Sequence, residues 1–147
     1  MRSHAAESPG GAAQEVTPGC RVVYVDKDPV ATAHGRLLLA DDPGSAAVQA
    51  DLREPDDVLG RPEVTRLLDL DEPVGLLLLL VVHFVRPEEE PGRLLARYRD
   101  RLAPGSFMVI SHATADDRAD TMRRAADTVR ESRSKDNLVY RTHAEVT

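Results

Sequence analysis

Short apolar runs alternate along the chain with longer stretches whose apolar positions recur at the spacing of an α-helix. The runs predict strands at residues 21–25, 46–50, 74–82 and 106–110, of which the first is expected to be buried on both faces and the third to be a buried strand. The helical spacing predicts helices that begin at Pro29 and Pro62, with further helices at residues 88–102 and 122–129. Strands that alternate with helices need crossover connections, which are typical of parallel sheets. The pattern therefore predicts an α/β fold, an open, doubly wound parallel sheet with helices on both faces.

The two ends of the sequence differ from this regular pattern. Residues 1–20 are rich in Ala, Gly, Ser and Pro and are expected to be loosely ordered, with a short helix at 12–16. Residues 21–147 are expected to form one partial domain, since no internal repeat or long linker divides them. Thr142 and Glu145 have the spacing of a helix-capping box, yet the sequence stops at Thr147. We therefore expect it to end inside a larger domain.

Composition excludes several classes of protein. The 147 residues are 41% hydrophobic and 30% charged, which is typical of one soluble globular domain. A net charge of -6 and the absence of Trp argue against nucleic-acid binding. The longest apolar run is far shorter than the roughly 20 residues of a membrane-spanning helix, so no membrane partner is expected. The single cysteine, Cys20, has no disulfide partner and favours a reducing, cytoplasmic location.

Polar residues that directly follow the predicted strands are the candidates for chemistry. Ligands of an open parallel sheet bind beyond the carboxyl ends of its strands. Asp26 follows the first strand, and its two carboxylate oxygens can accept from both hydroxyls of a ribose. Asp51 follows the second strand and can accept from the exocyclic amine of adenine. The alternative is that such aspartates only cap a helix or turn. Capping is the preferred interpretation for Asp28, which precedes Pro29.

Two histidines follow the later strands. His83 and His112 have no third ligand at a recognisable spacing, so no metal site is expected. A hydrogen-bonded residue at a strand boundary is a more common role for each than proton transfer, and no catalytic residue is assigned. The acidic run at residues 88–90 is interpreted as the first turn of the helix at 88–102.

Four sequence blocks, taken together, resemble one family. They are Arg-Val-Val-Tyr-Val-Asp-Lys-Asp-Pro at residues 21–29, Gln-Ala-Asp-Leu-Arg at 49–53, Val-Val-His-Phe at 81–84 and Leu-Ala-Pro-Gly-Ser at 102–106. Their order and spacing are similar to those of the S-adenosyl methyltransferase family, first catalogued as an actinobacterial domain of unknown function. The resemblance extends from residue 12 to about residue 146.

The resemblance implies a Rossmann-like fold, S-adenosylmethionine as the cofactor, and a methyltransferase that acts on a small molecule. It places Asp26, with Lys27 beside it, at the cofactor's ribose. It places Asp51 and Leu52 at the adenine, and His83 and Phe84 at the methionine part. Methyl transfer from a sulfonium depends mainly on positioning, so a catalytic triad is not required. The sequence does not indicate the methyl acceptor.

This sequence departs from the family pattern at its start. Family members carry a first strand and a glycine-rich loop upstream of the position of residue 12, and the pair Gly10-Gly11 does not replace that loop. The resemblance thus implies a domain truncated at both ends, without its first strand and its C-terminal strands. The first strand would lie between the strands at 21–25 and 74–82. Without that strand, the two neighbouring strands would have exposed edges. Exposed strand edges favour pairing with another chain, so a homo-oligomer is a further expectation.

Two alternative functions remain open from the residues. The first is a binding or interaction module that has this fold but no turnover. The second is a haloacid-dehalogenase-like phosphatase, with Asp26 as nucleophile, Mg²⁺ as cofactor and Ser111 at a later strand end. Pro29 argues against it because a helix begins before that family's turn and hairpin could form. A nicotinamide dehydrogenase is disfavoured because no Gly-x-Gly-x-x-Gly loop is present.

Overall fold

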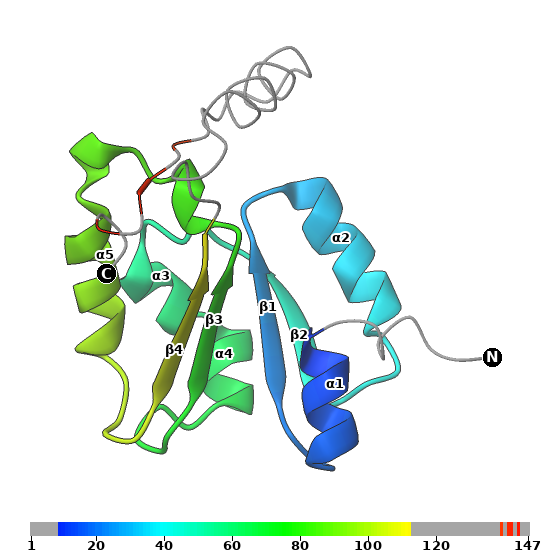
Figure 1. Cartoon of the computed structure of the whole chain (residues 1–147). Coiled ribbons are helices and arrows are strands. Elements are labelled where there is room, and N and C mark those ends of the chain that lie inside the picture. Colours follow the sequence, from blue (N-terminus) through cyan, green and yellow to red (C-terminus); the bar gives the residue numbers. More distant parts are fainter. Residues whose placement is uncertain (1–8, 113–138, 140, 143, 145–147) are drawn as a thin grey trace. The chain divides into compact units, whose positions relative to one another are not determined.

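The computed structural model describes residues 9–112, 139, 141–142 and 144, and the chain divides into two compact units, Met1–Glu72 and Pro73–Thr147 (Figure 1). The elements of the first unit are α1 (Pro9–Val16), β1 (Val22–Asp26), α2 (Pro29–Leu38), β2 (Ser45–Gln49), α3 (Pro55–Leu59) and α4 (Pro62–Leu67). The elements of the second unit are β3 (Gly75–Leu79), the 3-10 helices η2 (Val82–Phe84) and η3 (Pro87–Glu89), α5 (Pro91–Arg99) and β4 (Phe107–Ser111).

In the first unit, β1 and β2 form a parallel pair whose register runs from Val22 opposite Ser45 to Asp26 opposite Gln49. Helices α2 and α4 both contact this pair. Helix α2 begins where it was predicted to begin, because the fixed φ of Pro29 suits the first helical position. The short helix α3 was not predicted.

The buried strand of the first unit is β2, and the prediction that the first strand is buried on both faces is wrong. No residue of β1 is fully buried, whereas Ser45, Ala46, Ala47 and Val48 of β2 are. Their small side chains let α2 come close, and a Cβ added to Gly35 would lie 3.1 Å from the Cβ of Ala47. Tertiary contact with the helices therefore decides which strand is buried.

The side chain of Gln14 links helix α1 to the rest of this unit. The Nε2 atom of Gln14 donates to the carbonyl of Cys20, to Oδ2 of Asp42 and to the hydroxyl of Ser45, at 3.1–3.2 Å. Residues 1–8 lie outside the described part of the chain, and the loose order expected for residues 1–20 stays a prediction.

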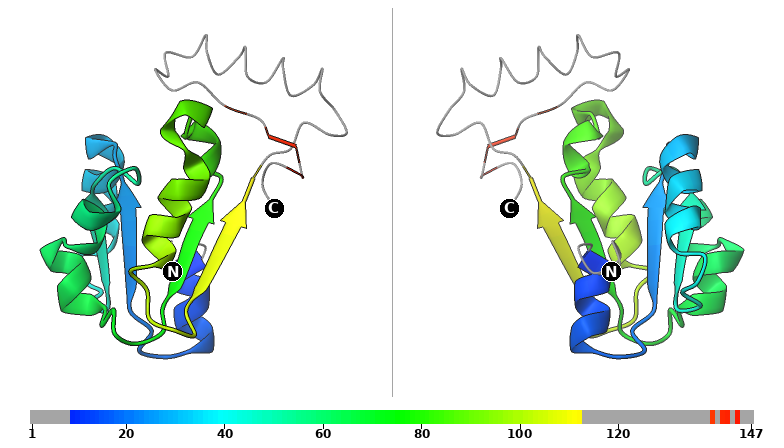
Figure 2. Two further views of the ribbon diagram at one scale, coloured as in Figure 1. Left: turned by 90° about the vertical axis from the view of Figure 1, so that its left-hand side faces the viewer. Right: turned by 90° about the vertical axis from the view of Figure 1, so that its right-hand side faces the viewer.

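In the second unit, β3 and β4 form a parallel pair whose arrows point the same way in both views of Figure 2. The strand predicted at 74–82 is shorter than expected, because β3 ends at Leu79 and Leu80 turns the chain with a φ of 53°. The prediction that this strand is buried is also wrong, because only Leu78 of β3 is buried. Leu78 is buried, while Leu77 lies on the opposite face, opposite Val109 in the register, and both of these residues are exposed.

The helix predicted at residues 88–102 is divided. Residues 87–89 form η3, Glu90 adopts a φ of 48°, and α5 begins only at Pro91. The α conformation is disfavoured for a residue that precedes proline, which explains the break at Glu90. The acidic run is therefore not the first turn of α5. Leu94 and Tyr98 of α5 are buried.

The strands pair as β1 with β2 and β3 with β4, and no described strand joins the two sheets. The sequence analysis expected such a gap between the strands at 21–25 and 74–82. The helix predicted at 122–129 and the capping box of Thr142 and Glu145 involve residues outside the described part. Among the described residues, no helix has the length and apolar character to cross a membrane.

Candidate functional site

The carboxyl ends of β1 and β2 lie next to each other in the first unit. Asp26 stands opposite Gln49 in the register, and the amide of Ala50 donates to the carbonyl of Asp26 at 3.0 Å. Asp51 follows directly on the same strand end. The prediction that the segments bearing Asp26 and Asp51 are adjacent parallel strands is confirmed.

Asp26 is an exposed carboxylate with one oxygen engaged. Its Oδ1 atom accepts the amide of Asp28 at 2.9 Å, which fixes the side chain over the turn into α2. The hydroxyl of Thr32, a buried residue, lies 3.3 Å from the Asp26 carbonyl and holds the backbone beneath it. An engaged carboxylate oxygen still has a second lone pair, so Asp26 can accept both hydroxyls of a diol.

Asp51 is held by Arg53. Its Oδ1 atom accepts the Arg53 amide at 2.9 Å, and the guanidinium lies 3.1–3.2 Å from both carboxylate oxygens. About four lone-pair sites on a carboxylate leave room for a further donor. The Asp51 side chain keeps 40% of its surface exposed, and Leu52 beside it is half-buried. The pairing with Arg53 was missed, although the Asp-x-Arg spacing could have suggested it.

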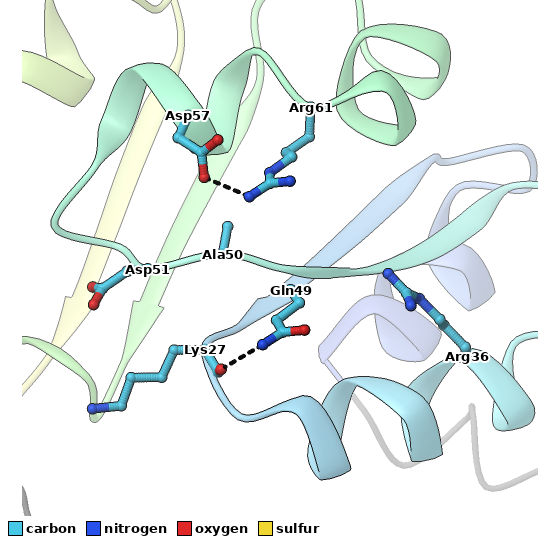
Figure 3. A pocket seen from close by; sticks show the side chains of 7 residues that line it. All are labelled: Lys27, Arg36, Gln49, Ala50, Asp51, Asp57 and Arg61. Carbon is cyan, nitrogen blue, oxygen red and sulfur yellow. Dashed lines mark hydrogen bonds and ion pairs between the residues drawn. The ribbon is translucent and has the colours of Figure 1, made fainter.

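An open pocket of about 450 Å³ adjoins this strand end (Figure 3). Gln49 donates to the Lys27 carbonyl at 3.3 Å, and Arg61 pairs at 2.7 Å with Asp57, four residues earlier, beside it in the pocket lining. The lining residues are Lys27, Arg36, Gln49, Ala50, Asp51, Asp57 and Arg61. Sequence analysis found Lys27 and Asp51 but missed the two arginines, because helices from separate segments bring them to β2.

The other two predicted site residues belong to η2 in the second unit. The His83 ring lies 4.6 Å from the Phe84 ring and makes an edge contact with the His112 ring at 5.6 Å, between ring centres. Burial lowers the pKa of His83 below its ordinary value, and the nearby His112 and Arg141 lower it further. The buried Nδ1 atom of His83 has no hydrogen-bond partner among the described residues.

Arg141 holds η2 from the C-terminal part of the chain. Its Nη1 atom donates to the carbonyl of Val82 at 3.1 Å, and its Nη2 atom donates to the carbonyl of Val85. Nη1 also lies 3.3 Å from Nε2 of His112. Sequence analysis did not single out Arg141, because a lone arginine close to the end of a chain carries no local signal.

The residues of the first unit fit part of the predicted cofactor. Asp26 and Asp51 offer carboxylate oxygens at neighbouring strand ends, as a ribose and an adenine amine require, and an open pocket reaches Asp51. Asp26, Lys27, Asp51 and Leu52 all lie in this unit, whereas His83 and Phe84 lie in the other. In the described ranges, no three His, Cys, Asp or Glu side chains cluster as metal ligands do.

The chain belongs to the S-adenosyl methyltransferase family, whose model matches residues 10–147. A proposed methyltransferase from Thermobifida fusca YX is 38% identical, with a TM-score of 0.79 over 91% of this chain and 49% of its own. A DUF574 family protein from Streptomyces avermitilis MA-4680 is 36% identical, with a TM-score of 0.85 over 95% of this chain and 54% of its own.

The chain thus spans about half the length of either solved structure. None of the curated proteins matches it. The similarities confirm the family resemblance and the Rossmann-like α/β class. Neither comparison supports the haloacid-dehalogenase-like phosphatase, and α2 begins at Pro29, where that family needs a turn and hairpin.

Proposed function

We propose that this chain binds the adenosine part of S-adenosylmethionine for methyl transfer to a small molecule. The observation that carries the proposal is the placement of Asp26 and Asp51 at neighbouring strand ends of one parallel pair. Asp26 accepts the ribose hydroxyls, while Asp51 accepts the adenine amine and Leu52 covers the ring. The family name supports the choice of cofactor.

The residues of this chain act by binding and orientation. When bound, S-adenosylmethionine supplies a methyl group on a positively charged sulfur. Asp26 is held by the Asp28 amide and Asp51 by Arg53, so neither carboxylate needs to be ordered by the ligand. Preordered groups lose less conformational entropy on binding. The contact of His83 and Phe84 with the methionine part stays a prediction of the family resemblance, because these residues belong to the second unit.

Calorimetry with S-adenosylhomocysteine and with adenosine tests this proposal. We expect the full chain to bind both ligands and Asp26→Asn to bind each about tenfold more weakly, because a neutral amide accepts hydroxyls less strongly than a carboxylate. Asp51→Asn is expected to act in the same direction. The matched control is Asp41→Asn, which makes the same charge change at an exposed position outside the pocket.

A wild-type chain that binds neither ligand would contradict the proposal, as would equal affinities for Asp26→Asn and Asp41→Asn. A second candidate is a binding module that has this fold but no turnover. Release of S-adenosylhomocysteine from S-adenosylmethionine, in the presence of a panel of small acceptors, distinguishes the two. Binding without release supports the module.

A further inference from the structure

The pocket at the end of β2 has a polar lining. Apart from Ala50, every residue that lines its volume of about 450 Å³ is charged or polar. Pockets for uncharged small molecules are lined mostly by apolar and aromatic side chains. The adenosine part of S-adenosylmethionine is uncharged and has its proposed contact with this lining at Asp51. The rest of the lining therefore favours a charged ligand group.

Arg36 brings a positive charge to this lining from α2. Its Nε atom donates to the carbonyl of Ala47 at 3.1 Å, which holds the guanidinium at the edge of β2. A carbonyl is neutral, so this bond does not balance the charge. Arg36 forms no ion pair with a carboxylate in the part of the chain that the structure describes. Because the bond uses Nε, the two terminal nitrogens keep their donors for a ligand.

Arg61 brings a second guanidinium to the same pocket, from the start of α4 (Figure 3). Its Nη2 atom donates to Asp57 at 2.7 Å, and its buried Nε atom has no hydrogen-bond partner among the described residues. The side chain keeps 39% of its surface exposed, so the guanidinium is accessible to a ligand. Most buried polar atoms have a partner, so Arg61 has unused donor capacity.

The carboxylates of the lining already have cationic partners. Asp57 pairs with Arg61, and both oxygens of Asp51 contact the guanidinium of Arg53, which is outside the lining. The charge of Arg36 is therefore in excess over the acidic charges of the pocket. The chain as a whole has a net charge of -6, so a positive pocket attracts anions against the general charge of the molecule.

We propose that this pocket is an anion site that binds a phosphoryl group through the guanidiniums of Arg36 and Arg61. A guanidinium donates two parallel hydrogen bonds to a pair of phosphate oxygens. Two guanidiniums from different helices need acceptor oxygens that point in more than one direction, which a tetrahedral phosphate offers and a planar carboxylate does not. The ligand is free phosphate or a small organic phosphate. S-adenosylmethionine carries no phosphate, so this inference does not rest on the proposed function.

Calorimetric titrations of the full chain with inorganic phosphate and with glycerol 3-phosphate, at constant ionic strength, test the proposal. We expect a dissociation constant of about 1 mM or lower for the tighter of the two. Arg36→Gln and Arg61→Gln should each weaken binding about tenfold, because each removes a charged donor pair. The matched control is Arg66→Gln, which makes the same charge change at an exposed position of α4 outside this pocket and should leave the affinity unchanged.

Asp57→Asn supplies a change in the opposite direction. Asp57 competes with a phosphate for the Arg61 guanidinium and repels the anion, so its neutralisation should tighten binding about threefold. Asp56→Asn makes the same charge change in the same helical turn, at an exposed residue outside the lining, and should have little effect. Equal tightening in both variants would indicate a general charge effect and would overturn the proposal.

A wild-type chain that binds neither phosphate compound overturns the proposal, as does an Arg66→Gln variant that is weakened as much as Arg36→Gln. If Arg36→Gln does not fold, Arg61→Gln decides the question, because the ion pair that it removes lies at the surface. Tighter binding of glycerol 3-phosphate identifies an organic phosphate as the ligand, and tighter binding of inorganic phosphate identifies free phosphate.

The two proposals fail separately. Asp26 is outside the pocket lining, so Asp26→Asn should weaken adenosine and leave phosphate affinity unchanged. A wild-type chain that binds phosphate but neither adenosine nor S-adenosylhomocysteine ends the proposed function alone. A chain that binds adenosine but no phosphate compound ends the anion site alone.

Discussion

The carboxylate of Asp28 caps α2, whereas that of Asp26, two residues earlier, accepts the Asp28 amide itself. Asp28 accepts the amides of Val30 and Ala31 at 2.7 and 3.1 Å. Two aspartates in one turn thus have different roles. The Asp26 side chain lies at the end of β1, whereas the Asp28 side chain caps α2.

Asp28→Ala should separate these roles. Loss of the cap leaves two helical amides without their acceptor, and the free energy of unfolding should fall by about 1 kcal/mol. Urea unfolding followed by circular dichroism measures this. Asp26→Asn should instead weaken ligand binding with little effect on stability. A similar loss of stability in both variants would show that the two residues share one structural role.

Asp42 should make the protein less stable in acid. Hydrogen bonds from Ser45, then from Gln14 and the Gly44 amide, lower the pKa of Asp42 below its ordinary value of 3.8. The folded state therefore favours the charged form, and this stabilisation is present above about pH 3.8 and lost as the pH falls through the folded-state pKa.

Asp42→Asn removes that titration. Its melting temperature should lie below that of the wild type at pH 7, and the difference should shrink as the pH approaches 3. The neighbouring variant Asp41→Asn serves as control, and it should follow the wild-type profile. A constant difference between Asp42→Asn and the wild type at every pH would rule out a contribution from the carboxylate charge.

His83 should also lose stability as the pH falls, as Asp42 does, but in a higher pH range. Because its pKa is lowered below 6.5, the unfolded chain binds a proton more readily than the folded one. The free energy of unfolding should therefore fall as the pH drops below 6.5, until the folded-state pKa is reached. His83→Gln should flatten the stability profile between about pH 5 and pH 7. The exposed His34→Gln should keep the wild-type slope, and an unchanged slope in His83→Gln would refute the prediction.

Gly35 should tolerate no branched side chain. Its Cβ would meet that of Ala47 at 3.1 Å, so Gly35→Val must push α2 away from β2. Overpacking of this kind costs about 1–3 kcal/mol. Gly92→Val is the matched control, because a Cβ at Gly92 meets nothing within 4 Å. Equal unfolding midpoints for the two variants would show that α2 moves away from β2 without loss of stability.

Local patterns predicted those elements whose signals lie within a few residues of each other. The Asp28-Pro29 pair fixed the start of α2, and the apolar runs located all four described strands to within a few residues. The same runs did not predict burial. The Leu-rich run of β3 has an exposed face, whereas the Ser-Ala-Ala segment of β2 is buried, because burial depends on which helix packs against a strand.

The sequence by itself determined the α/β class, the family and the position of Asp26 and Asp51 at successive strand ends, since strand periodicity and the residue after each strand are local properties. Tertiary structure decided which side chains surround them. Arg36 and Arg61 reach the pocket at Asp51, and Arg141 reaches η2, from segments distant in the chain. Contacts of that kind form only when the chain folds, so no spacing in the sequence encodes them.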